Sequence, residues 1–426
     1  MTPFSWHHIM HQKHKKLAEE AGLGNNQKEP RFQPIEPLWT KQFILIAMLN
    51  LLAVAGLHIY MSTFPFYILY LGGNEMIIGF TAGGVALLAL LVRPLAGWFL
   101  DNISRRKLLV WGLITTVFVS VSYLFVPILN FVVIIRCLSG IAFSGLNTAT
   151  TTVICDTVPK SRFSEGISMF GLTQSLSMAI APALGLVIMH SMGFTPLFIL
   201  GTTLPLAGII IAYKLTFKPA AKEAGLPLRP FTLRNLFNKD ALPAAVVGFW
   251  GSLPFAGVGA FVALYAQEYG ISTGGGYFTL MAIGTCLMRL LCGKVADKHG
   301  EGPVIYAGNA LMCAAMLLLV WPSSLTFYIS AISYGLGIGL AIPALQAMAV
   351  RIAPVERRGS ASSTFLCGFD LSIALGGPLV GWLVVQSGYT NMFAWMAAFL
   401  VVSTLFYGLW AAKSPSAFKN ARRNVA

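Results

Sequence analysis

Long apolar runs limit what this chain can fold into. A helix needs about 20 predominantly apolar residues to cross the hydrocarbon core of a bilayer. Runs of this kind lie at 42–70, 78–100, 107–127, 131–155, 166–190, 194–214, 242–267, 276–296, 303–322, 325–352, 361–386 and 389–412. Only 10% of the residues are charged, against about 25% in soluble domains. Because a soluble fold would expose far too much apolar surface, the sequence predicts an all-α membrane protein with twelve transmembrane helices.

The basic residues predict how these runs are oriented. Arg93, Arg136 and Arg289 lie inside runs, and the other 26 lysines and arginines fall in the tails, the central stretch and every second loop. Since loops rich in Lys and Arg stay in the cytoplasm, both termini are predicted to be cytoplasmic, in a plasma or inner cell membrane. Residues 1–41 lack the apolar core of a signal peptide. This placement accounts for the formal net charge of +14 without nucleic-acid binding.

A short pattern occurs once in each half of the chain. The sequences RPLAGWFLD, from Arg93, and RLLCGKVAD, from Arg289, both place an Arg four residues before a Gly and eight before an Asp. The same register aligns Gln174 with Asp370. Such repeats on apolar segments indicate a membrane protein built from two similar halves. The predicted parts are a basic tail (1–41), a six-helix bundle (42–214), a cytoplasmic linker (215–241), a second six-helix bundle (242–412) and a C-terminal tail (413–426).

The loop after the second run carries the most specific motif. Gly97, Asp101, Arg105 and Arg106 resemble the signature loop of the major facilitator superfamily, Gly-x-x-x-Asp-x-x-Gly-Arg-[Arg/Lys], with Ser104 in place of its second Gly. The resemblance covers about residues 42–412. It implies a transporter with twelve helices in two pseudo-symmetric six-helix bundles, which rock against each other around a central substrate site.

Other stretches resemble motifs of exporters in this superfamily. Arg136-x-x-x-Gly140 is similar to the Arg motif of the proton-driven exporters. The stretch 177–185 resembles the antiporter motif of the fifth span, with Pro182 and Gly185 kept. In that stretch and just after it, Ser177, Ala181 and Leu186 replace glycines of the motif. In the second half of the chain, Glu301 stands where the second signature loop is expected to have an Arg.

The resemblance therefore implies a secondary active transporter, with proton-coupled efflux of a small organic solute as the favoured function. Its partners would be the substrate, protons and the lipid bilayer, and it would act as a monomer without a cofactor. An importer or uniporter of the same fold, a non-transporting membrane sensor and a lipid flippase are the alternatives. The sequence contains no phosphate-binding loop with Gly-Lys-Ser/Thr and nothing that resembles a catalytic apparatus, so an enzyme is not expected.

The repeated motif is predicted to control the change between conformations. Asp101 is expected to face the N-terminus of the 361–386 helix, whose dipole stabilises a carboxylate, and Arg105 is expected to pair with Asp156. The motif arginines precede the loop aspartates by about 12 Å and are expected to brace the helix ends. The predicted gating residues are Gly97, Asp101, Arg105, Arg106, Asp156, Gly293, Asp297, Arg93, Arg289, Pro182 and Pro378.

Asp370 is the only carboxylate well inside an apolar run. It lies about 14 Å from the nearer end of its run, close to the middle of a core about 30 Å thick. An ionised carboxylate there is costly unless a proton, an arginine or a substrate neutralises it. Asp370 is thus a predicted proton carrier or substrate anchor, with a fixed structural pair as the alternative. His58, inside the first run, is predicted to take part in proton coupling or to line the cavity, because histidine titrates near neutral pH.

Arg136 is predicted to contact the substrate or to regulate Asp370. With three embedded arginines and one embedded carboxylate, the interior is not rich in acid, which favours a substrate that bears a carboxylate or another anionic group. Neutral polar and aromatic residues are predicted to complete the cavity, although each alone can instead hold helices together. They are Asn50, Tyr60, Asn147, Gln174, Trp250, Tyr334 and Gln346.

Cysteine and histidine positions do not predict a metal site within the runs. The six cysteines lie in apolar runs and are interpreted as small buried hydrophobic residues. In the N-terminal tail, His7, His11 and His14 would share one face of a helix and could then bind a transition metal. A basic tail on the membrane surface, or one without regular structure, is the preferred interpretation.

Overall fold

The computed structural model describes residues 37–159, 163–217, 219, 225, 238–271, 274–350 and 358–414, apart from the side chains of 101, 163–165, 167, 168, 290–299 and 358–360. The predicted N-terminal tail with its histidines, most of the predicted linker and residues 415–426 lie outside the described residues. The structure that follows belongs to one compact unit, Leu38–Ala426.

Every regular element among the described residues is a helix, which confirms the all-α prediction. The long helices follow the predicted runs closely, because the apolar segments between polar loops determine where they begin and end. They are α2 (Lys41–Tyr70), α3 (Glu75–Asn102), α4 (Arg105–Phe125), α5 (Leu129–Thr157), α6 (Phe163–Met192), α7 (Phe194–Lys214), α8 (Leu242–Glu268), α9 (Gly274–His299), α10 (Glu301–Leu318), α11 (Ser324–Val350) and α12 (Arg358–Leu409), with short 3-10 helices η3 (Lys239–Ala241) and η5 (Ala411–Lys413).

The last two predicted spans form one bent element. Gly388, with φ of 77°, separates residues 358–387 from 389–409 within α12; this left-handed backbone conformation suits glycine, which has no Cβ. Among the described residues, ten helices, α12 counted once, are long and apolar enough to cross a membrane. Helix α9 is not among the ten, because its side chains are described only as far as Arg289, a stretch too short to be counted as a span. Its span therefore stays a prediction.

Polar residues at the helix starts explain several boundaries. The side chains of Thr40, Asn74 and Ser104 accept hydrogen bonds from backbone N–H groups in the first turns of α2, α3 and α4. Ser104 is the residue that replaces a glycine of the superfamily signature. Its backbone is extended, with φ of −172°, so the position does not require glycine, and its hydroxyl instead caps α4.

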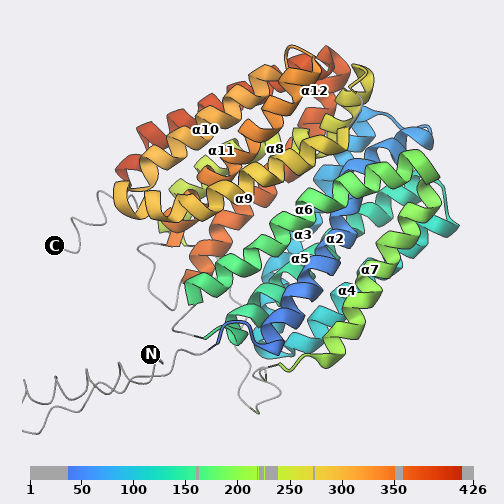
Figure 1. The fold of residues 1–426 in the computed structure, drawn as a ribbon, viewed down its shortest axis with the longest axis vertical. Helices are drawn as coiled ribbons and strands as arrows, with labels where there is room; N and C mark the ends of the chain where they lie inside the picture. The colour runs from blue at the N-terminus through green and yellow to red at the C-terminus, as the bar shows by residue number, and fades with distance from the viewer. Residues whose placement is uncertain are drawn as a thin grey trace, which may run out of the picture. The chain divides into compact units, whose positions relative to one another are not determined.

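The same helix contacts occur in both halves of the chain. Helices α2 to α7 lie together, and α8 to α12 lie together (Figure 1). The contacts of α3 with α5 and of α4 with α5 in the first half correspond to those of α9 with α11 and of α10 with α11 in the second. The halves meet where α3 packs on α12, α6 on α9 and α2 on α8.

The two ends of the helices differ in charge. We call the end that contains Lys41, Arg105 and Lys214 the basic end, and the end that contains Tyr70 and Phe125 the opposite end. A hydrogen bond links two elements of the basic end: the backbone N–H of Thr216, which follows α7, donates to Oε1 of Gln42 in α2 at 3.2 Å.

Small residues bring the halves into close contact near the opposite end. A Cβ added at Gly83 of α3 would lie 2.5 Å from the carbonyl oxygen of Ala374 and 2.6 Å from Cδ of Pro378, both on α12. On the other side of the molecule, Cα of Ala183 in α6 would lie 3.2 Å from a Cβ added at Gly275 in α9. Nearer the basic end, a Cβ added at Gly97 would meet no atom of the described residues within 4 Å.

A valine in place of Gly83 is expected to separate the halves at the opposite end, because its side chain would overlap the α12 backbone. The measurement is maleimide labelling of Ala260→Cys, a cavity residue of α8, in a chain without its native cysteines. A membrane-impermeant reagent applied from the opposite end should label this cysteine about tenfold faster in the Gly83→Val background, a shift that requires about 1.4 kcal/mol. Gly145→Val is the control, because a Cβ there first meets Cδ1 of Leu108 at 3.7 Å. Equal labelling rates for the two glycine variants would contradict the expectation.

Candidate functional site

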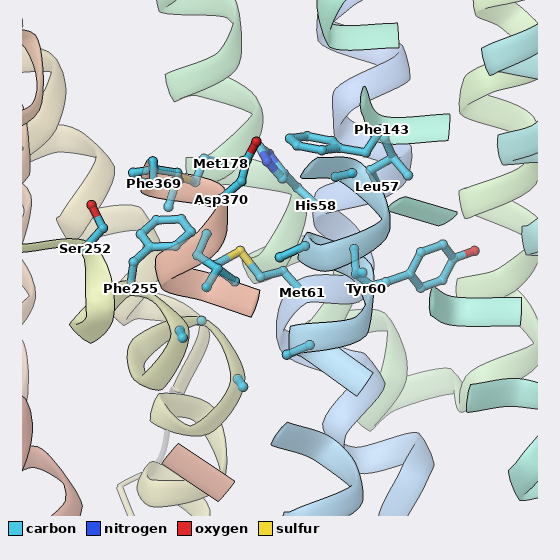
Figure 2. A pocket seen from close by; sticks show the side chains of 18 of the residues that line it. Leu57, His58, Tyr60, Met61, Phe143, Met178, Ser252, Phe255, Phe369 and Asp370 are labelled. Atoms are coloured by element: carbon cyan, nitrogen blue, oxygen red, sulfur yellow. The ribbon is translucent and has the colours of Figure 1, made fainter. Parts of the chain in front are cut away.

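A cavity of about 320 Å³ lies between the two halves. In the described part of the chain, nine helices line it, namely α2, α3, α5, α6 and α8 to α12. Figure 2 shows the side chains of His58 and Tyr60 from α2, Ser252 and Phe255 from α8, and Asp370 from α12 around it. A central space bounded by both halves is the arrangement that the resemblance implies for a substrate site.

Asp370 is paired with Arg93 inside the protein. Nη2 of Arg93 on α3 lies 2.7 Å from Oδ2 of Asp370 on α12, and the two side chains are 9% and 8% exposed. The ion pair therefore joins the first half to the second. The fixed pairing of Asp370 with an arginine, given above as the alternative to a functional role, is thus present with Arg93, and the predicted role of Arg136 at the substrate or in regulating Asp370 stays a prediction. Arg93 and Asp370 meet because α3 packs on α12 across the halves.

The second copy of the repeat makes the corresponding contact at the other interface. Nη1 of Arg289 on α9 donates to Oγ of Ser175 at 2.8 Å and to the carbonyl oxygen of Gly171 at 3.2 Å, both on α6. Gln174, next to Ser175, is the residue that aligns with Asp370 in the repeat. Both repeat arginines thus connect the halves, one through a carboxylate and the other through neutral oxygens.

Arg136 lies near the opposite end of the molecule, about 10 Å along α5 from its first residue. Its Cζ is 5.5 Å from the ring centre of Tyr60 and 5.1 Å from that of Phe64, so the guanidinium makes cation–π contacts with two aromatic rings. Nη1 also donates to Oγ of Ser139 over 3.4 Å. Within the described part of the chain, Arg136 has no carboxylate partner.

His58 lines the cavity from α2. Its Nδ1 lies 3.1 Å from Oγ of Ser177 on α6, and either atom can be the donor, depending on the histidine tautomer. Asp370 reaches the same cavity from α12 (Figure 2). The structure therefore brings the two predicted proton-coupling residues to one space.

The other predicted cavity residues divide into two groups. Tyr60, Gln174 and Tyr334 line the cavity. The remaining four are not among the lining residues. Asn50 donates to Oγ1 of Thr173 at 2.8 Å, and Gln346 donates to Oγ of Ser362 at 3.3 Å. Trp250 stacks on Phe406, and Asn147 of α5 is the fourth. Three of these four thus make the helix-to-helix contacts given as the alternative in the sequence analysis.

Some cavity residues were missed by the sequence analysis. Ser175 and Ser252 line the cavity, and Ser177 contacts the lining residue His58, but single serines are common in membrane helices and give no distinguishing signal. The sequence signal that pointed to Ser177 was its place in the antiporter-like stretch, where it was treated only as a replacement for glycine.

At the basic end, the signature loop makes one of the two contacts expected of it, the pair of Arg105 with Asp156. Nε of Arg105 lies 2.7 Å from Oδ2 of Asp156, so the expected pair is present. Nη1 of Arg105 also donates to the carbonyl oxygen of Pro219 at 3.2 Å. Cζ of Arg106 lies 5.3 Å from the ring centre of Tyr213 on α7. These contacts join α4 to α5, to α7 and to the stretch that follows α7.

Other predicted gating residues are only partly described. The side chains of Asp101 and Asp297 lie outside the described part of the structure, and Gly293 is placed only by the course of α9. The carbonyl oxygen of Pro182 accepts a hydrogen bond from Ser62 Oγ at 3.1 Å, and Pro378 packs against Gly83 at the interface of α12 with α3.

Comparison with known proteins agrees with this architecture. The family model described as Major Facilitator Superfamily matches residues 45–281 and 275–425. The chain belongs to the major facilitator superfamily. It is a membrane transporter of this superfamily and not an enzyme, since its relatives and structural neighbours are transporters.

Several members of the superfamily are similar over most of the chain. The staphylopine export protein of Staphylococcus aureus is 24% identical over 335 residues, 76% of this chain and 84% of that protein. The multi-drug resistance efflux pump PmrA of Streptococcus pneumoniae is 25% identical over 382 residues, 84% of this chain and 92% of the pump. Among solved structures, the nucleoside transporter NupG has a TM-score of 0.70 at 14% identity, over 87% of this chain and 99% of NupG, which shows a shared fold.

Proposed function

We propose that this major facilitator superfamily transporter exports a small organic solute from the cytoplasm in exchange for protons. The observation that carries the proposal is the buried pair of Arg93 and Asp370, 2.7 Å apart, which connects the two halves beside the central cavity. A titratable group that bridges two moving halves can couple protonation to their arrangement, because the proton then binds one conformation more tightly than the other. The similarity to an export protein and an efflux pump supports the outward direction.

The proposal places the basic end in the cytoplasm and the opposite end on the outer face of the cell membrane. The support is the restriction of the basic loop residues to one end of the helices.

In the proposed cycle, a proton arriving from outside neutralises Asp370 and removes its attraction to Arg93. Because this pair connects α3 to α12, its loss favours separation of the halves at the basic end. Release of the proton to the cytoplasm and entry of the solute then restore the charged pair and favour the outward-open state. His58 lines the same cavity and is proposed to pass protons to Asp370, with Ser177 holding its ring.

Two kinds of membrane vesicle test the proposal. Inverted vesicles that contain the transporter, with an acidic interior, are expected to accumulate its solute from a cell extract, as identified by mass spectrometry. The accumulation should be lost when nigericin collapses the pH gradient, and vesicles without the transporter provide the control. Solute accumulation in right-side-out vesicles under external acid would instead identify an importer. Flux that follows the solute gradient alone would identify a uniporter, and binding without flux would identify a sensor.

A further inference from the structure

The charges on the cavity wall favour one class of solute. Among the described residues that line the cavity, three carry a formal charge: Arg136, Arg289 and Asp370. Arg93 already neutralises Asp370 at 2.7 Å, so two arginines remain without a carboxylate partner in the described part of the chain. An organic cation would enter a wall with excess positive charge, whereas an anion would be attracted to it.

The contacts of Arg136 leave most of its hydrogen-bond donors available. Cζ of Arg136 lies 5.5 and 5.1 Å from the ring centres of Tyr60 and Phe64. A cation–π contact depends on the charge of the guanidinium and does not by itself require one of its N–H groups as a hydrogen-bond donor. Among the described residues, one of its five N–H donors makes a long bond to Ser139, 3.4 Å, and the guanidinium also interacts with the Tyr123 hydroxyl. An acid group that accepts two parallel N–H bonds fits the remaining edge.

Arg289 differs from Arg136 in this respect. Its Nη1 already donates to Ser175 at 2.8 Å and to the carbonyl oxygen of Gly171 at 3.2 Å. These bonds hold the side chain at the interface between α9 and α6. Arg136 is therefore the residue better placed to receive an anion.

The rest of the cavity suits an apolar body with one further polar group. Met61, Met178, Phe255 and Phe369 are among its apolar lining residues, and its volume of about 320 Å³ lies at the lower end of the range for drug-sized ligands. Ser252 lines the cavity from α8, is 2% exposed, and its Oγ has no hydrogen-bond partner among the described residues. Figure 2 shows Ser252 and Tyr60 on opposite sides of the cavity.

We propose that the cavity binds a small organic anion, with its acid group on the N–H edge of Arg136, an apolar body between the methionine and phenylalanine side chains, and space for a hydrogen-bonding group at Ser252. This inference names the substrate class of the proposed exporter, and it depends on that proposed function only for the statement that the bound anion is also transported.

Three probes of equal shape test the inference on the purified full-length protein. Naphthaleneacetate, naphthylethanol and naphthylethylammonium share one apolar body and carry a negative, zero and positive charge. Binding is measured at neutral pH without a gradient, by isothermal titration calorimetry. The acid is expected to bind about tenfold or more tightly than the alcohol, as for a charge-assisted pair of hydrogen bonds, and the ammonium compound most weakly.

Variants of Arg136 determine whether this preference comes from the proposed contact. Arg136→Gln should reduce the ratio of acid to alcohol affinity to near one, and Arg136→Lys should retain part of it, because lysine keeps the charge but not the two parallel donors. Lys214→Gln removes a positive charge from an exposed residue at the end of α7 and should leave the ratio unchanged. Thermal melting of each variant verifies folding, and the ratio of two ligands on the same variant cancels a general loss of protein.

The results distinguish this inference from the proposed function. A preference for the ammonium compound, a ratio that survives both Arg136 substitutions, or the absence of acid preference at millimolar concentration overturns the anion site. If the acid binds through Arg136 but a pH gradient does not drive its flux in vesicles, proton-coupled export fails and the anion site stands. If a gradient drives flux of the alcohol or the ammonium compound and the acid is not preferred, export stands and the anion site fails.

Discussion

Asp370→Asn is expected to abolish transport driven by a pH gradient while the protein remains in the membrane at its normal level. Asparagine has nearly the shape of aspartate but cannot bind and release a proton, so the proposed exchange loses its coupling step. The groups around Asp370 remain in the variant: Arg93 on α3, His58 on α2 and Arg289 on α9, the last two lining the same cavity. The measurement is solute accumulation in inverted vesicles with an acidic interior.

Two comparisons make this result specific to Asp370. Glu268→Gln removes a carboxylate from an exposed residue at the end of α8 and should leave gradient-driven transport unchanged. Exchange of labelled solute at equal pH on both sides needs no net proton movement, and it should persist in Asp370→Asn if the cavity is intact. Undiminished gradient-driven transport by Asp370→Asn would remove this residue from the mechanism.

Arg93→Gln is expected to destabilise the folded transporter. It leaves a buried carboxylate, 8% exposed, without its cation, and breaking a buried ion pair by removing one partner costs about 3–5 kcal/mol. The double variant, Arg93→Gln with Asp370→Asn, should recover most of this stability, because two neutral amides can form a hydrogen bond. It should not recover gradient-driven transport. Unfolding of the purified protein by denaturant, arranged as a double-mutant cycle, measures the interaction.

The cycle has a clear negative outcome. If the effects of the two single substitutions on the free energy of unfolding add in the double variant, the side chains do not interact in the membrane protein, and the pair cannot serve as the connection between the halves. Arg106→Gln provides a comparison at an exposed position, where the guanidinium contacts the ring of Tyr213, and its loss should cost about 1 kcal/mol or less.

The sequence predicted the positions of the helices along the chain better than it predicted their partners. The run expected at 42–70 is the helix Lys41–Tyr70, because the alternation of apolar runs and polar loops determines both ends. Spacing along one helix also gives the depth of a residue, which is why Asp370 was recognised as central. It does not reveal which helices of the two halves face each other, so the pairing of Arg93 with Asp370 was not predictable from it.

The same limitation affects the direction of single side chains. Trp250 was expected in the cavity, but it stacks on Phe406, with ring centres 6.2 Å apart, because an aromatic residue in an apolar run packs equally well against a neighbouring helix. Asn50 likewise bonds to Thr173. The pair of Arg105 and Asp156 was predictable because opposite charges were expected at the same end of two neighbouring helices, where few other partners are available.

The unequal contacts of the two repeat arginines have a consequence for how the halves move. Arg93 holds a carboxylate that a proton can neutralise, whereas Arg289 holds a hydroxyl and a backbone carbonyl that keep their charge state at any physiological pH. Acid sensitivity is thus confined to one of the two edges that the repeat arginines connect. We therefore expect acidification to loosen the α3–α12 edge first, with the α6–α9 edge acting as the pivot of an asymmetric opening.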